Sequence, residues 1–150
     1  MILTSETRIN RSPEYVWPFI EDPERMKAWN PRIVDFEELG WGARGVGFRY
    51  NVRYRKGEGV LDAFVEIDSY RVQEEYAFRL SGGQLPAGGY ARVIFELRGC
   101  NEGTHVKRTI DLTHARLPRV LRIVVGLAGR VGAPAGKEGL ARLKKVVEAT

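Results

Sequence analysis

Apolar and polar residues alternate along most of the chain between residues 33 and 113, and this period of two predicts strands with one buried face. The clearest case is segment 48–55. One of its faces carries Phe48, Tyr50, Val52 and Tyr54, and the other carries Arg49, Asn51, Arg53 and Arg55. Glycine-rich and polar turns separate the alternating segments. The pattern predicts antiparallel strands at 3–9, 33–39, 48–55, 60–70, 75–80, 90–98 and 104–113.

Two short helices are predicted between the first strand and the second. Ser12 followed by Pro13 is typical of a helix N-cap with proline at the first helical position, and Asp22 followed by Pro23 repeats the signal. Apolar residues recur there at helical spacing: Val16, Phe19, Ile20, Met26 and Trp29. The order of elements is therefore a strand, two short helices and a long strand-rich middle.

The chain after Leu117 is predicted to be one long amphipathic helix that closes the sheet. Four glycines fall near its apolar stripe: Gly129, Gly132, Gly136 and Gly139. Each costs up to about 1 kcal/mol relative to alanine inside a helix. We interpret the missing side chains as space for a ligand; the alternatives are close contact between helix and sheet, or a break near Pro134. Pro134 predicts a kink or a short loop around 132–136.

Composition limits the classes of function. A chain of 150 residues is predicted to form one domain, 1–150, with its own core. The net charge of +5 comes from scattered residues with no basic stripe, so we expect no nucleic-acid partner. A single cysteine cannot form an internal disulfide. The N-terminus has no signal-like apolar segment and no run is long enough to span a membrane, which predicts a cytoplasmic protein.

The N-terminal motifs and the order of elements resemble the START-like helix-grip superfamily (SRPBCC), which includes polyketide cyclases and lipid-transport proteins. Segment 12–17, SPEYVW, looks like the family's first helix, and DPERM at 22–26 with WNP at 29–31 looks like its second. The resemblance implies an α+β helix-grip fold, in which a seven-stranded curled antiparallel sheet wraps around a long C-terminal helix. It also implies an elongated apolar cavity between sheet and helix.

The strand pattern predicts what would line such a cavity. Apolar and aromatic side chains with a few phenol hydroxyls suit a hydrophobic ligand that bears sparse polar groups. The alternative is an ordinary filled core. We predict a ligand-binding set of Phe48, Tyr50, Tyr54, Tyr76, Phe78, Phe95, Arg108, Gly129 and Gly132.

Two polar residues are unusual in this setting. Arg108 shares its strand face with Val106 and Ile110, where a guanidinium needs a partner. It could fix a ligand carboxylate or enolate, pair with Glu66 or Asp68, or reach a rim of the cavity. His114 follows the same strand and is the better general acid or base of the two histidines. If the chain is an enzyme, its catalytic candidates are Arg108, His114, Tyr50 and Tyr76.

Motifs of other enzyme classes are missing from the sequence. We find neither metal-ligand spacing, a nucleophile elbow, a Walker loop nor a Rossmann fingerprint, so we expect no metal and no cofactor. The glycine-rich segment 40–48 joins two strands and opens no helix, which argues against a phosphate site. We interpret it as a flap over the cavity mouth, with a bent hairpin as the alternative.

Three classes of function follow from these observations. The first is binding or transport of a hydrophobic small molecule such as a lipid, isoprenoid or polyketide. The second is a cyclase or dehydratase that acts on a polyketide-like substrate in the same cavity. The third is a protein-interaction module similar to the chaperone-activator branch. The terminal helix could also touch a membrane surface transiently through Arg116, Arg119, Arg122 and Arg130. The sequence does not predict the oligomeric state.

Overall fold

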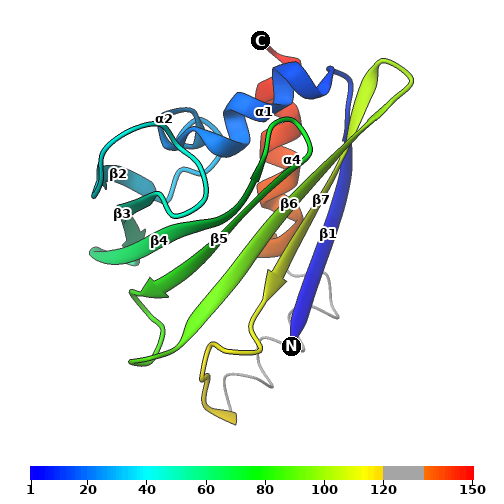
Figure 1. Cartoon of the computed structure of the whole chain (residues 1–150). Helices are drawn as coiled ribbons and strands as arrows, with labels where there is room; N and C mark the ends of the chain where they lie inside the picture. Colours follow the sequence, from blue (N-terminus) through cyan, green and yellow to red (C-terminus); the bar gives the residue numbers. More distant parts are fainter. Residues whose placement is uncertain (120–133) are drawn as a thin grey trace.

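The protein is described by a computed structural model that covers residues 1–119 and 134–150. Within these residues, seven strands and three helices form an α+β fold (Figure 1). The strands are β1 (Ile2–Ile9), β2 (Ile33–Glu38), β3 (Arg49–Lys56), β4 (Gly59–Arg71), β5 (Glu75–Gly82), β6 (Tyr90–Cys100) and β7 (Gly103–Asp111). The helices are α1 (Pro13–Glu21), α2 (Pro23–Met26) and α4 (Pro134–Glu148).

All seven strands belong to one antiparallel sheet with the order β1-β7-β6-β5-β4-β3-β2. Six of the seven follow one another as neighbours, and β1 joins the far edge beside β7. The predicted strands are confirmed, with ends that differ by at most about two residues, as is usual for such boundaries. The register shifts between Ile33 and Asp35 and again between Ile67 and Ser69, which bends the sheet locally.

The two short helices lie between β1 and β2, as predicted. Pro13 occupies the first turn of α1, but the Ser12 side chain makes no capping hydrogen bond; the Ser12 carbonyl accepts from the amides of Tyr15 and Val16 instead. Asp22 does cap α2, because its carboxylate accepts from the Glu24 amide at 3.0 Å.

The helix α4 lies across one face of the sheet, with α1 and α2 beside one end of that face (Figure 1). Its apolar side consists of the buried residues Leu140, Leu143 and Val147. The Lys144 ammonium donates to the Arg8 carbonyl at 2.6 Å, which ties the helix to strand β1 at the edge of the sheet. We call the face of the sheet that these helices cover the inner face.

The predicted terminal helix lies only partly within the described residues. Residues 112–118 are turn or irregular backbone, and Arg119 is helical, so the helix begins within two residues of the start predicted after Leu117. Gly129 and Gly132, with most of the predicted apolar stripe, lie outside the described residues. Within the described residues, no helix is long and apolar enough to cross a bilayer.

Candidate functional site

The strand register defines which residues share the inner face, because directly paired residues of antiparallel strands point to the same side. Arg108 of β7 lies opposite Ser5 of β1 and Phe95 of β6, and Phe95 in turn lies opposite Tyr76 of β5. Farther along, Tyr50 of β3 pairs with a buried valine of β4. The register therefore brings most of the predicted lining onto one face: Phe48, Tyr50, Tyr54, Tyr76, Phe78, Phe95 and Arg108.

The inner face is densely packed at the end next to α1. Tyr50 and Tyr76 are 2% and 0% exposed, and their hydroxyl oxygens are 3.3 Å apart. The Trp17 ring meets the edge of Tyr76 with ring centroids 6.3 Å apart, and Phe36 meets Tyr50 at 6.4 Å. Such edge-to-face contacts add to the burial energy of the rings. Buried rings fill most of this end, and Phe36 and Tyr70 are half-buried at its margin.

The paired phenols stay neutral in this environment. Burial raises the pKa of Tyr50 to about 12, partly offset by its hydrogen bond with Tyr76. Burial, followed by the adjacent Tyr50, raises the pKa of Tyr76 well above its ordinary value. Both groups can therefore donate a hydrogen bond at neutral pH, and neither is suited to act as a general base.

A charged pair that the sequence analysis missed lies beside the phenols. Glu21, on the last turn of α1, is buried and accepts from the Arg44 guanidinium at 2.7 Å and 3.4 Å. The Tyr70 hydroxyl donates to the same carboxylate at 3.3 Å. One signal was available: Glu21 lies four residues after Trp17, and residues at this spacing share a helix face. Arg44, in the segment taken for a flap, carried no such signal.

The ion pair between Arg44 and Glu21 also holds the glycine-rich loop that joins β2 to β3. Backbone hydrogen bonds hold its two ends, with the Leu39 amide donating to the Arg49 carbonyl at 2.9 Å and the Gly47 amide to the Ile67 carbonyl at 2.8 Å. The loop is therefore attached to β3 and β4 at its base and to α1 at its middle.

The inner face becomes more accessible toward the opposite end. The apolar residues there are half-buried and continue the lining from strand to strand: Leu3, Val52, Tyr54, Leu80, Val93 and Ile110. The hydroxyl of Tyr54 lies against Gly83 in the β5–β6 loop. A gradient thus runs along the inner face, from a filled core at α1 to partly accessible apolar side chains at the far end.

Arg108 lies between these two ends and against α4. Its side chain is only 9% exposed, and burial lowers its pKa. A Cβ at Gly139 would lie 2.7 Å from the Arg108 Nη1 atom, so the guanidinium occupies the space that a side chain at 139 would need. At Gly139 the missing side chain therefore allows close contact between helix and sheet, which was the alternative to space for a ligand.

Of the alternatives for Arg108, the pairing with Glu66 or Asp68 is wrong. Asp68 binds Arg92 at 2.8 Å and Arg79 at 3.4 Å. Glu66 lies opposite Arg49 and Arg79 in the strand register, and these residues point to the outer face of the sheet. The register shift after Ile67 lies between the two acidic residues, but both remain on the side away from Arg108.

The structure does not bring His114 to the inner face. It is exposed after β7, and its ring stacks on Tyr90 with centroids 5.1 Å apart and planes inclined by 21°. The Arg79 guanidinium lies over the Tyr90 ring, 5.1 Å from the ring centroid. Both residues lie on the outer face. In the other histidine, His105 of β7, the Nε2 atom lies 3.9 Å from the Oε1 atom of Glu6 on the neighbouring strand β1. With both histidines elsewhere, the polar side chains that the described strands place on the inner face are phenols, hydroxyls and Arg108.

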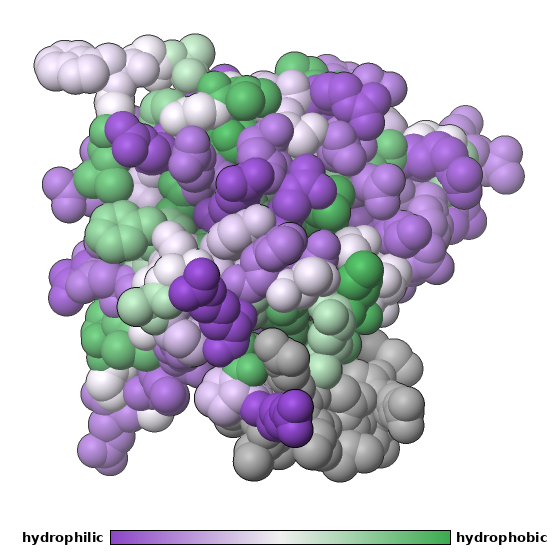
Figure 2. Space-filling model, turned by 60° about the horizontal axis from the view of Figure 1, so that its bottom comes forward, coloured by the Kyte–Doolittle hydropathy of each residue, from purple (hydrophilic) through white to green (hydrophobic). Residues whose placement is uncertain are grey.

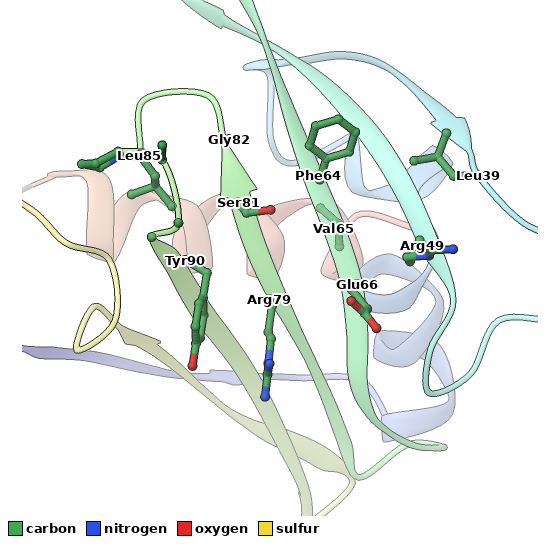
Figure 3. Close-up of a pocket in the computed structure, with 14 residues that line it drawn as sticks. Leu39, Arg49, Phe64, Val65, Glu66, Arg79, Ser81, Gly82, Leu85 and Tyr90 are labelled. Atoms are coloured by element: carbon green, nitrogen blue, oxygen red, sulfur yellow. The ribbon is translucent and has the colours of Figure 1, made fainter.

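Two open pockets of similar size are lined by described residues. One, of about 670 Å³, lies on the outer face between β3, β4, β5 and the β5–β6 loop, where Arg49, Glu66, Arg79, Phe64 and Tyr90 surround it (Figure 3). The other, of about 660 Å³, lies between the β1 edge and α4. Neither is an enclosed cavity between the inner face and the helix.

The face shown in Figure 2 is mainly hydrophilic, and the described residues offer no grouping of metal-binding side chains. In Figure 2, hydrophilic residues cover most of the described surface in view, and hydrophobic residues form only small groups between them. Among residues 1–119 and 134–150, no three His, Cys, Asp or Glu side chains are grouped so that they could hold a metal ion.

This arrangement of a curled sheet, a helix across it and two short helices at one end agrees with the family comparison. The sequence model for "Polyketide cyclase / dehydrase and lipid transport" matches residues 1–148. The chain belongs to this family. The family has the helix-grip (SRPBCC) fold, which confirms the fold that segments 12–17 and 22–31 predicted. No curated protein matches it by sequence.

Solved structures with the same fold have low sequence identity to this family member. The crystal structure of Ara h 8.0201 is 16% identical, covers 100% of this chain and 99% of its own, and superposes with a TM-score of 0.72. The protein TTHA0849 from Thermus thermophilus is 18% identical over 99% of this chain and 98% of its own, with a TM-score of 0.72. The solution structure of the Aha1 dimer from Colwellia psychrerythraea is 18% identical, covers 93% of this chain and 98% of its own, and has a TM-score of 0.57. These likenesses establish the fold alone.

Proposed function

We propose that the protein binds a hydrophobic small molecule, such as a lipid, isoprenoid or polyketide, against the inner face of its sheet. The observation that carries this proposal is the gradient along that face. A core that served stability alone would be packed at both ends, because partly exposed apolar surface contributes less than fully buried surface. Here six apolar side chains at the end away from α1 stay half-buried on a continuous face.

The polar groups of the inner face suit a ligand with one or two oxygen functions. Arg108 lies at the boundary between the packed and the accessible end, with Ser5 directly opposite it in β1. A guanidinium presents five N–H donors in a fixed plane and suits a carboxylate or an enolate. The remaining lining offers a large apolar contact area that would exclude water from such a contact.

A matched pair of substitutions on one strand tests this proposal. Val93 and Ile94 are adjacent, branched and half-buried, but Val93 faces the inner side and Ile94 the outer side. The fluorescent probe 1-anilinonaphthalene-8-sulfonate is titrated into each variant. Val93→Trp fills the accessible end, so we expect about a tenfold loss of probe affinity, as overpacking of an apolar pocket predicts. Ile94→Trp should bind the probe like the unmodified protein. Equal affinity in the two variants would contradict the proposal.

A cyclase or dehydratase reaction on the same face is the second candidate, and it requires the packed end to open so that a substrate oxygen reaches the buried hydroxyls of Tyr50 and Tyr76. Neutral hydroxyls held away from water can stabilise charge that develops on a substrate oxygen. Tyr76→Phe removes one hydroxyl with little change in shape. With a polyketide-like substrate, an enzyme would lose turnover in this variant but keep probe binding, whereas a carrier would show no turnover in either form.

A further inference from the structure

The loop between β2 and β3, residues 39–48, exposes a tryptophan completely. Trp41 is 100% exposed, whereas Trp17 and Trp29 are buried in the core. Val46, on the same loop, is 70% exposed. Water contact with a large aromatic side chain is unfavourable, so complete exposure of the largest apolar ring calls for an explanation.

The loop presents this ring from a fixed base. Gly42 and Gly47 directly follow Trp41 and Val46, and their φ values of +90° and +91° are a backbone conformation that side chains disfavour. Arg44, between them, binds the buried Glu21 of α1 at 2.7 Å. Trp41 therefore projects from an anchored loop rather than from a loose chain end.

The size of the exposed tip decides which kind of partner fits it. A stable protein interface needs about 800 Å² of surface from each partner, which a tip of two apolar side chains separated by glycines does not supply. A fluid lipid surface adapts to an isolated projection, and tryptophan is enriched at the level of the lipid headgroups. The chain also carries a net charge of +5, which attracts it to anionic lipids.

We propose that loop 39–48 docks the protein on an anionic lipid surface, with Trp41 and Val46 entering the headgroup layer. The loop lies beside α1 and α2 in Figure 1, so docking would place that end of the molecule on the membrane. Loop 39–48 is a different segment from the terminal helix for which the sequence pattern predicted membrane contact, and two arginines of that prediction, Arg122 and Arg130, lie outside the described residues. It does not depend on a ligand at the inner face.

Intrinsic fluorescence tests the proposal directly, because two of the three tryptophans are buried. The protein is mixed with phosphatidylcholine vesicles, with and without phosphatidylglycerol, and its emission and co-sedimentation are measured. We expect a blue shift and salt-sensitive binding on the anionic vesicles. Trp41→Ala should lower the partition coefficient about tenfold, as loss of a buried aromatic ring predicts.

A matched pair of valines gives the control. Val46 and Val72 are 70% and 59% exposed, but Val72 lies in the turn between β4 and β5. Val46→Ala should weaken vesicle binding, and Val72→Ala should not. Unchanged emission on anionic vesicles, or equal binding of Trp41→Ala and the unmodified protein, would overturn the proposal. Val93→Trp should bind vesicles normally, so a failure of ligand binding and a failure of docking are told apart.

Discussion

At the residue scale, the buried hydroxyls of Tyr50 and Tyr76 are the groups whose chemistry depends most on their surroundings. Their hydroxyl oxygens are 3.3 Å apart among aromatic rings, where an ionised phenol would lose its hydration. Each hydroxyl is the hydrogen-bond partner of the other. The pair is therefore a neutral donor and acceptor unit inside an apolar face.

This environment predicts how stability depends on alkaline pH. The pKa of Tyr50 is about 12 in the folded protein and close to 10 when it is exposed. Above pH 10 the unfolded chain releases this proton while the folded protein retains it, so the free energy of unfolding falls as pH rises from 10 to 12. The loss amounts to about 3 kcal/mol when complete. Urea titrations across this range should show a shallower fall for Tyr50→Phe than for the half-buried control Tyr54→Phe; equal slopes would contradict the assignment.

Arg108 and Gly139 show which residue-scale features a sequence can supply. Alternation along β7 predicted that Arg108 faces inward, because parity in a strand fixes the side of every residue. The pattern could not predict that its guanidinium reaches α4 at Gly139, since that contact joins two elements 31 residues apart. The wrong pairing with Glu66 and Asp68 has a different origin, because alternation along β4 already places both acidic residues on the face opposite to Val65 and Ile67.

At the element scale, the β2–β3 loop is held by its ion pair with α1. Glu21 is nearly enclosed, and its carboxylate has contacts from Arg44 and Tyr70. Arg53 also bridges acidic residues, Asp35 at 3.6 Å and Asp62 at 3.7 Å, but all three side chains are exposed. The two arginines therefore differ mainly in how far their partners are shielded from water.

This difference predicts unequal effects of removing each charge. Arg44→Gln leaves a buried carboxylate without its cation and should lower the free energy of unfolding by about 1–3 kcal/mol. Arg53→Gln should cost at most about 0.5 kcal/mol, because exposed ion pairs are screened by solvent. Urea denaturation of both variants provides the measurement. If the two losses are equal, Arg44 does not anchor the loop as described.

The elements themselves could be predicted from the sequence more fully than the site. A strict period of two and proline-marked helix starts are local signals, and they located all seven strands and both short helices. The Glu21–Arg44 pair joins a helix end to a distant loop, and no local pattern encodes it. The exposure of Trp41 was equally hidden, because a glycine-rich loop can fold inward or outward.

At the scale of the whole molecule, one sheet presents two different surfaces. The inner face is apolar, is packed by α1 at one end and stays partly accessible at the other. The outer face carries rows of charges, such as Arg49, Glu66 and Arg79 on neighbouring strands. Fold and family establish this architecture, and the ligand is a separate question because one fold hosts many functions.

The central claim is that the inner face holds a hydrophobic small molecule. Native mass spectrometry of the purified protein, followed by solvent extraction and identification of any released molecule, tests it most directly. We predict one defined hydrophobic molecule bound at a fixed stoichiometry, retained by Ile94→Trp and lost from Val93→Trp. The absence of any bound molecule, together with an unchanged melting temperature across a panel of lipids and polyketides, would contradict the claim and favour a protein-interaction module with a filled core.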